Sequence, residues 1–87
     1  MKTVYKYGFS MKTSKFSLLL PVGFKFLSVM FQDEKPQMWC EVVDGVTKEQ
    51  YDFALFGTGQ EIPISAEYLT TFSVGPFIFH LYRVFAA

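Results

Sequence analysis

The chain has 87 residues, a hydrophobic fraction of 51% and a formal net charge of zero at pH 7. This length fits one domain, residues 1–87, and the hydrophobic fraction excludes a disordered chain. The zero net charge argues against a nucleic-acid partner. Apolar residues exceed what a single small core readily absorbs, which favours a homo-oligomer, because small domains gain stability by association.

The first segment alternates in a way that predicts a β-strand. Within Thr3–Ser10, the aromatic residues Tyr5, Tyr7 and Phe9 are separated by polar or small residues. A period of two is typical of a strand with one side against a core. We therefore expect these three aromatic side chains to form one core-facing stripe.

The next apolar segments predict a second strand and a hairpin. Phe16–Leu20 is ended by Pro21, which cannot donate a hydrogen bond to a neighbouring strand. Phe24–Gln32 and Met38–Val43 flank a charged turn and therefore indicate a hairpin. Because Phe24–Gln32 is apolar on both sides, we expect it to be a central strand or to face a subunit partner.

The second half of the chain predicts three more strands, over Tyr51–Phe56, Thr70–Val74 and Phe77–Val84. Gly75-Pro76 indicates a tight hairpin or a bend between the last two. Ser65 can cap one helical turn near residues 64–69. The expected fold is all-β and mainly antiparallel, a small barrel or sandwich of six or seven short strands joined by sequential hairpins, with at most that one helical turn.

The charges are distributed unevenly along the chain. Residues 1–25 carry lysines and no acid, whereas residues 33–67 carry every Asp and Glu. This division creates either two faces of opposite sign or, if the first strand lies beside the acidic part, a cancelled field. We expect cancellation.

One glycine-rich segment is a candidate ligand site. Gly57, Thr58 and Gly59 follow a predicted strand, and amides around such glycines can bind an anion. The segment lacks the GK[ST] of a P-loop, so it is also readily explained as a turn that needs positive φ.

His80, Trp39 and Lys25 complete the set of candidate binding residues. On a strand, the only histidine shares a face with Tyr82 and is either structural or a donor to a ligand or partner. Trp39 is a core residue or, if exposed, an interface anchor, and we favour the core. Lys25 is a further candidate contact to a nucleotide-like ligand.

No catalytic, metal or cofactor motif is present, so we expect no enzyme, no metal and no cofactor. The single cysteine, Cys40, excludes an intrachain disulfide and reads as a small buried hydrophobe. Glu41 and Asp52 could face each other across a hairpin, although carboxylates on a sheet surface are far commoner than an acid–base pair. The apolar stretch Phe16–Phe31 is interrupted by Pro21 and is too short to span a membrane.

Several short motifs occur in an order that resembles a known family. They are the following: YKY at Tyr5–Tyr7, LPVG-x-x-FLSV at Leu20–Val29, Trp39 followed by Val42-Val43-Asp44, Gly57-Thr58-Gly59, Thr71-Phe72 and Phe79-His80. The chain resembles, over nearly its whole length, a family of small proteins with a domain of unknown function, encoded largely by bacteriophages and prophages. Arg83-Val84 after the last hydrophobic residues departs from that pattern.

The resemblance implies a non-enzymatic protein that acts by stoichiometric binding in the cytoplasm of a bacterial host. The expected function is an oligomeric inhibitor of a host protein or of an antiviral-defence component. The alternative is a sponge that sequesters a nucleotide-like defence signal in a pocket near Gly57–Gly59, with contacts from His80, Trp39 and Lys25.

Overall fold

The computed structural model describes residues 1–85 and contains seven β-strands and no helix in that part of the chain. The predicted all-β class and strand number are therefore confirmed. The strands are β1 (Lys2–Gly8), β2 (Lys15–Pro21), β3 (Lys25–Gln32), β4 (Lys35–Val43), β5 (Lys48–Gly57), β6 (Glu67–Val74) and β7 (Phe77–Val84).

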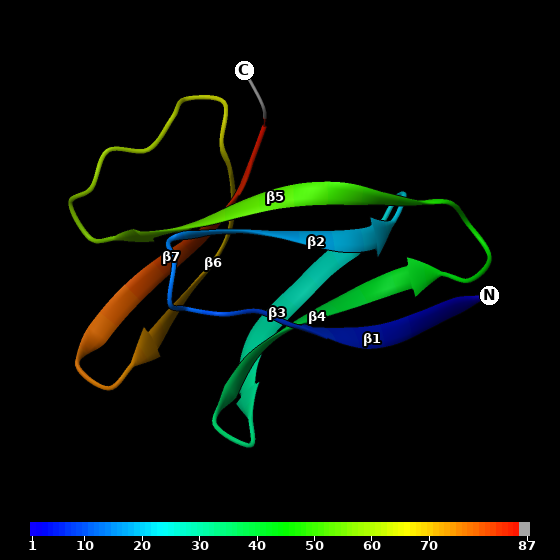
Figure 1. Ribbon diagram of the computed structural model, residues 1–87, viewed down its shortest axis with the longest axis horizontal. Helices are drawn as coiled ribbons and strands as arrows, with labels where there is room; N and C mark the ends of the chain where they lie inside the picture. Colours follow the sequence, from blue (N-terminus) through cyan, green and yellow to red (C-terminus); the bar gives the residue numbers. More distant parts are fainter. Residues whose placement is uncertain (86–87) are drawn as a thin grey trace.

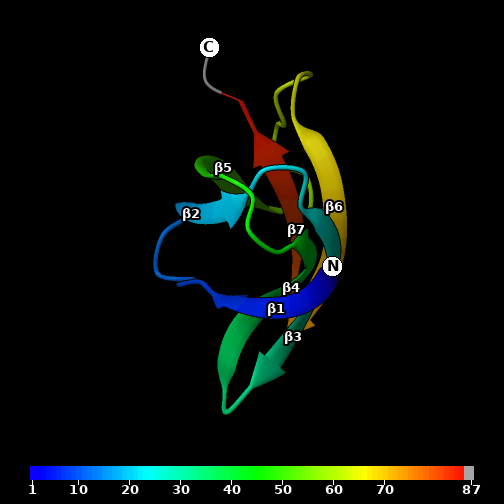
Figure 2. The same ribbon diagram turned by 90° about the vertical axis from the view of Figure 1, so that its right-hand side faces the viewer.

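The strands form two antiparallel sheets that pack as a sandwich-like globule, not as a closed barrel (Figure 1). One sheet has the order β1-β4-β3 and the other the order β2-β5-β7-β6. Only β3–β4 and β6–β7 are hairpins of consecutive strands, so the expectation of sequential hairpins throughout was wrong. The pairs β1–β4 and β2–β5 are brought together by connections that cross from one sheet to the other, whereas β5 and β7 are neighbours because β6 lies at the edge of the same sheet. Figure 2 shows β1 and β2 apart on one side of the molecule.

The predicted hairpin of residues 24–43 is confirmed, but its turn is shorter than expected. Gln32 pairs with Lys35, so Asp33 and Glu34 alone make the turn, with φ of 52° and 63°. Two positive φ values are what the twist of a tight hairpin requires. Pro36, expected in the turn, lies near the start of β4.

β3 is an edge strand, which corrects one of the two alternatives expected for Phe24–Gln32, that of a central strand. Its free side faces β6, where the rings of Phe31 and Phe72 lie 6.3 Å apart. Both strands carry an irregularity in their pairing, between Phe26 and Ser28 in β3 and between Tyr68 and Thr70 in β6. Phe31 shares the inner face of β3 with Val29, so the seam does not cover the apolar outer side, where Met30 remains 53% exposed.

The segment before β6 does not form the helical turn that Ser65 was expected to cap. The amide of Ala66 donates to the carbonyl of Pro63 at 3.0 Å, which closes a single turn, and β6 begins at the next residue, Glu67. The chain is extended from there, because Tyr68 and the residues after it pair with β7.

The core lies between the inner faces of the two sheets, where the inner face of a sheet is the one turned toward the other sheet. Its fully buried side chains include Leu20, Met38, Val42, Phe53 and Leu81. The aromatic alternation contributes as predicted at Phe9, which stacks on Phe16 at 4.6 Å. Tyr5 lies on the same side of β1 but remains 50% exposed, so the stripe is only partly covered.

The expected cancellation of charge is seen at one ion pair. β1 does lie beside β4, and Lys2 Nζ is 3.3 Å from a carboxylate oxygen of Glu41. Within residues 1–85, no other Lys or Arg reaches a carboxylate at this distance. Residues 1–85 contain no helix with the length and apolar character needed to cross a membrane.

Candidate functional site

The outer face of the four-stranded sheet carries a row of aromatic rings that crosses three strands. Tyr68 on β6, Tyr82 on β7 and Phe56 on β5 form this aromatic row. The Tyr68 and Tyr82 rings are 5.4 Å apart and the Phe56 and Tyr82 rings 5.5 Å apart, both in edge-to-face geometry. Such pairs hold rings in place beyond simple burial. Tyr68 nevertheless remains 55% exposed, so part of this fixed aromatic surface is open to solvent.

A row of hydrogen-bonded polar side chains runs beside the aromatic row. His80 on β7 lies between two threonines, with Nε2 3.0 Å from Thr58 Oγ1 and Nδ1 2.8 Å from Thr71 Oγ1. The Thr71 hydroxyl is also 2.8 Å from the hydroxyl of Tyr68, which connects the two rows. A neutral imidazole has one donor and one acceptor nitrogen, so one threonine donates to His80 and the other accepts. We call Thr58, His80 and Thr71 the polar row.

A tight turn after β5 places Thr58 against His80. The amide of Gln60 donates to the carbonyl of Gly57 at 3.2 Å, and Gly59 has a φ of 92°. A type II turn requires positive φ at this position, which explains the second glycine. The amide of Gly57 donates to Oε1 of Gln60 at 2.6 Å. That amide is therefore already occupied, and the geometry favours the turn interpretation over the anion cradle.

An open groove continues the outer face toward β2. Its volume is about 630 Å³, and its lining includes Lys15, Ser17, Asp52, Phe56, Glu61, Pro63, Val84 and Phe85. Ser17 donates a hydrogen bond of 2.6 Å to Asp52, which orients this carboxylate on the groove floor. Aromatic and aliphatic walls with a few polar groups are the usual lining of a ligand site.

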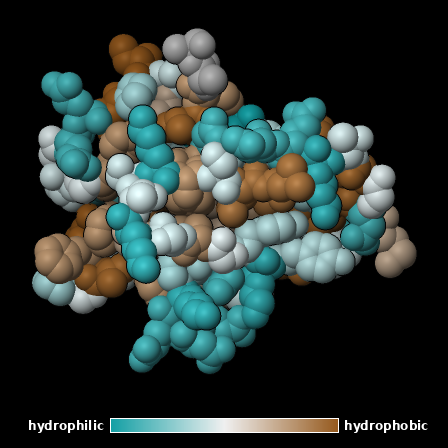
Figure 3. Space-filling model, viewed as in Figure 1, coloured by the Kyte–Doolittle hydropathy of each residue, from teal (hydrophilic) through white to brown (hydrophobic). Residues whose placement is uncertain are grey.

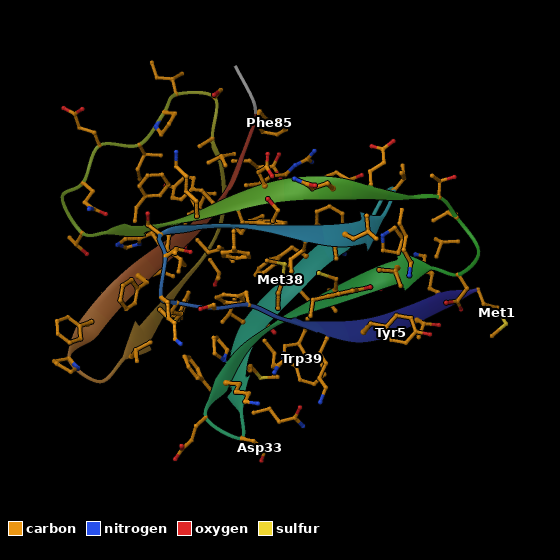
Figure 4. The ribbon with its side chains drawn as sticks, viewed as in Figure 1. Met1, Tyr5, Asp33, Met38, Trp39 and Phe85 are labelled. Atoms are coloured by element: carbon orange, nitrogen blue, oxygen red, sulfur yellow. The ribbon has the colours of Figure 1, made fainter. Side chains whose placement is uncertain are left out.

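Trp39 and Lys25 lie on the other side of the molecule, so the six candidate residues do not form one site. Both project from the outer face of the three-stranded sheet, where Lys25 pairs in register with Glu41. The preferred interpretation of Trp39 as a core residue was wrong, because Met38 and Cys40 are the fully buried residues of the inner face of β4, and Figure 4 shows Met38 and Trp39 on opposite sides of this strand. Trp39 is half-buried, and its buried Nε1 has no hydrogen-bond partner within residues 1–85.

The remaining titratable candidates are separated or buried. Cys40 is fully buried, as expected, and this burial raises the pKa of its thiol to about 11. It is therefore protonated at neutral pH and a poor nucleophile. Glu41 and Asp52 belong to different sheets and do not face each other. No three His, Cys, Asp or Glu side chains of residues 1–85 gather closely enough to hold a metal ion.

The aromatic row and the Thr71 contact were missed at the sequence level, although one signal pointed to the latter. A two-residue turn at Gly75-Pro76 pairs Val74 with Phe77, and counting back from it places Thr71 opposite His80. Tyr68 cannot be placed in this way, because the irregularity in β6 shifts the pairing beyond Thr70.

The comparisons with known proteins identify a family and no activity. Searches of the curated proteins and of the solved structures gave no match. A family model described as a domain of unknown function, DUF7352, matches residues 1–86. This match covers nearly the whole chain and agrees with the resemblance to a family of unknown function. The chain therefore belongs to the DUF7352 family.

Proposed function

We propose that this protein is a non-enzymatic binding protein that recognises a partner protein through the outer face of its four-stranded sheet. The observation that carries the proposal is the polar row beside the aromatic row. His80 is held from both ring nitrogens, and Tyr82 is held by rings on both sides. Groups fixed in this way lose little conformational freedom on binding, which favours affinity.

The proposed partner is a host protein or a component of antiviral defence, and the proposed setting is the cytoplasm of a bacterial host of a phage or prophage. The support is the resemblance of the motifs to phage-encoded proteins. Stoichiometric inhibition needs a surface and no catalytic group, and an exposed aromatic row suits it because tyrosines are enriched at the centres of interfaces. The proposal also includes self-association.

The test is a pull-down from host lysate with three forms of the protein. Tyr82→Ala removes the middle ring of the aromatic row, and Lys25→Ala is a matched control on the opposite outer face. The wild type and Lys25→Ala are expected to retain the same partner in a one-to-one ratio. Tyr82→Ala is expected to weaken binding by about 10- to 100-fold, the effect of losing an interface anchor. A partner that Tyr82→Ala retains at full affinity would contradict the proposed face.

A second candidate is a sponge for a nucleotide-like signal, and the groove is the observation that favours it. Its volume of about 630 Å³ fits a small molecule, and the ring of Phe56 offers a stacking surface. In the lining of the groove, the carboxylates of Asp52 and Glu61 would repel a phosphate group, whereas the ammonium group of Lys15 would attract it. Thermal shift against a panel of cyclic and linear nucleotides tests this candidate, because a ligand that binds the folded state raises Tm. An unchanged Tm across the panel contradicts it.

A further inference from the structure

The four edge strands of the sandwich differ in how they discourage pairing with another chain. Exposed edges offer unpaired backbone groups, and proteins commonly block them with bulges, prolines or cover. β3 and β6 carry irregularities and face each other, and β2 ends in Pro21. β1 has neither a bulge nor a proline, and its register with β4 is continuous from Lys2 to Gly8. Among the four edge strands of the described chain, β1 is thus the one with neither a pairing irregularity nor a proline.

The hydrogen bonds at both ends of β1 show which of its backbone groups are free. The amide of Phe9 donates to the carbonyl of Pro36, and the amide of Asp44 donates to the carbonyl of Met1, each at 3.2 Å. Bonded and non-bonded pairs alternate along an antiparallel ladder, so the odd-numbered residues of β1 face β4. The N–H and C=O groups that point away from the sheet therefore belong to Lys2, Val4, Lys6 and Gly8.

The side chains around this edge are incompletely covered on both faces of the sheet. Val4, on the outer face, is 51% exposed, and Tyr5, on the inner face, is 50% exposed. Figure 4 shows Tyr5 on β1, toward the end of the strand that carries Met1. An added strand at this edge would cover both residues at once.

We infer that β1 pairs with β1 of a second copy of this chain, antiparallel and centred on Tyr5. This register matches Lys2 with Gly8 of the second copy and Val4 with its Lys6. Every outward N–H and C=O group of both strands then has a partner, and the two three-stranded sheets become one continuous sheet of six strands. The two Tyr5 side chains meet on the inner face, at the twofold axis.

The lysines select this register over its neighbours. A pairing centred on Val4 places Lys2 opposite Lys6 of the second copy, and one centred on Lys6 places two Lys6 side chains opposite each other. Like charges directly opposite each other on one face destabilise a sheet. The pairing centred on Tyr5 opposes each lysine with an uncharged residue, Lys2 with Gly8 and Lys6 with Val4 of the second copy. The edge is therefore self-complementary.

This inference deepens the proposed function, which includes self-association, and does not depend on the partner-binding face. The mass in solution, measured by light scattering at several concentrations, is expected to approach twice 10.0 kDa as concentration rises. Val4→Pro removes an N–H group that points away from the sheet and leaves the hydrogen bonds between β1 and β4 in place. Edge strands tolerate proline at such a position. Val4→Pro is expected to abolish the dimer, whereas Val4→Thr retains it. A wild type that stays monomeric throughout overturns the inference.

A cysteine scan tests the register without relying on the proline variant. In this register the Tyr5 residues of the two copies lie opposite each other as a pair without mutual backbone hydrogen bonds. Their Cα atoms are therefore about 4.5 Å apart, which is within disulfide range. Tyr5→Cys is expected to cross-link through oxidised glutathione. Thr3→Cys, on the same face, lies about 13 Å from its copy and should not. Equal cross-linking of the two variants overturns the register. Partner capture by the wild type and Tyr82→Ala reports separately on the proposed function.

Discussion

The outer faces of the two sheets arise from the same alternation of side chains, but they differ in whether their polar side-chain groups have hydrogen-bond partners. On the four-stranded sheet, both ring nitrogens of His80 have partners, and the neighbouring rings fix one another. On the three-stranded sheet, the indole N–H of Trp39 is buried and has no hydrogen-bond partner within residues 1–85. The contrast shows that a polar side chain on an outer face joins an ordered surface where side chains on the neighbouring strands supply its hydrogen-bond partners.

Figure 3 adds a second contrast, between two hairpins. Hydrophilic side chains gather over the β3–β4 hairpin at the bottom of the view, and hydrophobic ones over the β6–β7 hairpin at the left. The first hairpin turns through Asp33 and Glu34, while the second carries Phe77, which is 65% exposed. The sheet with the ordered outer face thus also presents the more apolar tip.

The largest expected effect comes from removing a fully buried ring of the core between the two sheets. Phe53 is fully buried, 5.4 Å from the ring of Phe16 and 6.3 Å from that of Phe24. Phe53→Ala should lower the free energy of unfolding by about 3–5 kcal/mol, through lost burial and the cavity left behind. Urea denaturation followed by circular dichroism measures this. Amide signals that change in one sheet only would show that the two faces do not share a core.

A smaller loss is expected when the polar row is interrupted. Thr71→Val removes the hydroxyl that contacts both His80 and Tyr68, which should cost about 1 kcal/mol of unfolding free energy. Ser73→Ala, on the same strand and the same outer face, is the matched control and should leave stability unchanged. The side-chain NMR signals of His80 should shift in the first variant alone. Equal stability of both variants would mean that the row contributes no order.

The smallest effect, with the opposite sign, is expected on the other outer face. Trp39→Phe removes a buried N–H that has no partner in the described part of the chain, and relief of its desolvation outweighs the loss from the slightly smaller ring. The free energy of unfolding should rise by about 1 kcal/mol or less. Because Trp39 is the single tryptophan, circular dichroism must replace fluorescence as the probe. A clear loss of stability would place a partner on the indole N–H and remove the contrast between the faces.

Short-range features of this fold could be predicted from the residues themselves. The alternation of aromatic residues gave the strands, and turn residues gave the β3–β4 and β6–β7 hairpins. The face of Trp39 was also readable, since Met38, Cys40 and Val42 form an entirely apolar alternate set, whereas Glu41 shares the side of Trp39. This alternation was a better guide to the face of Trp39 than the expectation that it belongs to the core.

Long-range pairings could not be predicted in the same way. β1 pairs with β4, and β2 with β5, across long stretches of intervening chain, and no turn specifies either register. The position of β3 at an edge follows from those long-range pairings. Its own residues do not reveal it, because a strand that is apolar on both sides fits a central position equally well. The polar row was partly accessible through the β6–β7 turn, but the aromatic row depends on β5, which pairs with β7 over a long connection.

The seam between β3 and β6 has a mechanical consequence. Within residues 1–85, no pairing of backbone groups joins these two strands, and rings such as Phe31 and Phe72 rest on one another there. The sheets are tethered instead by three chain crossings, β1 to β2, β2 to β3 and β4 to β5. Separation of the two sheets at this seam would therefore require rings to slide past one another but no ladder hydrogen bond to break, and the three crossings would keep the sheets connected.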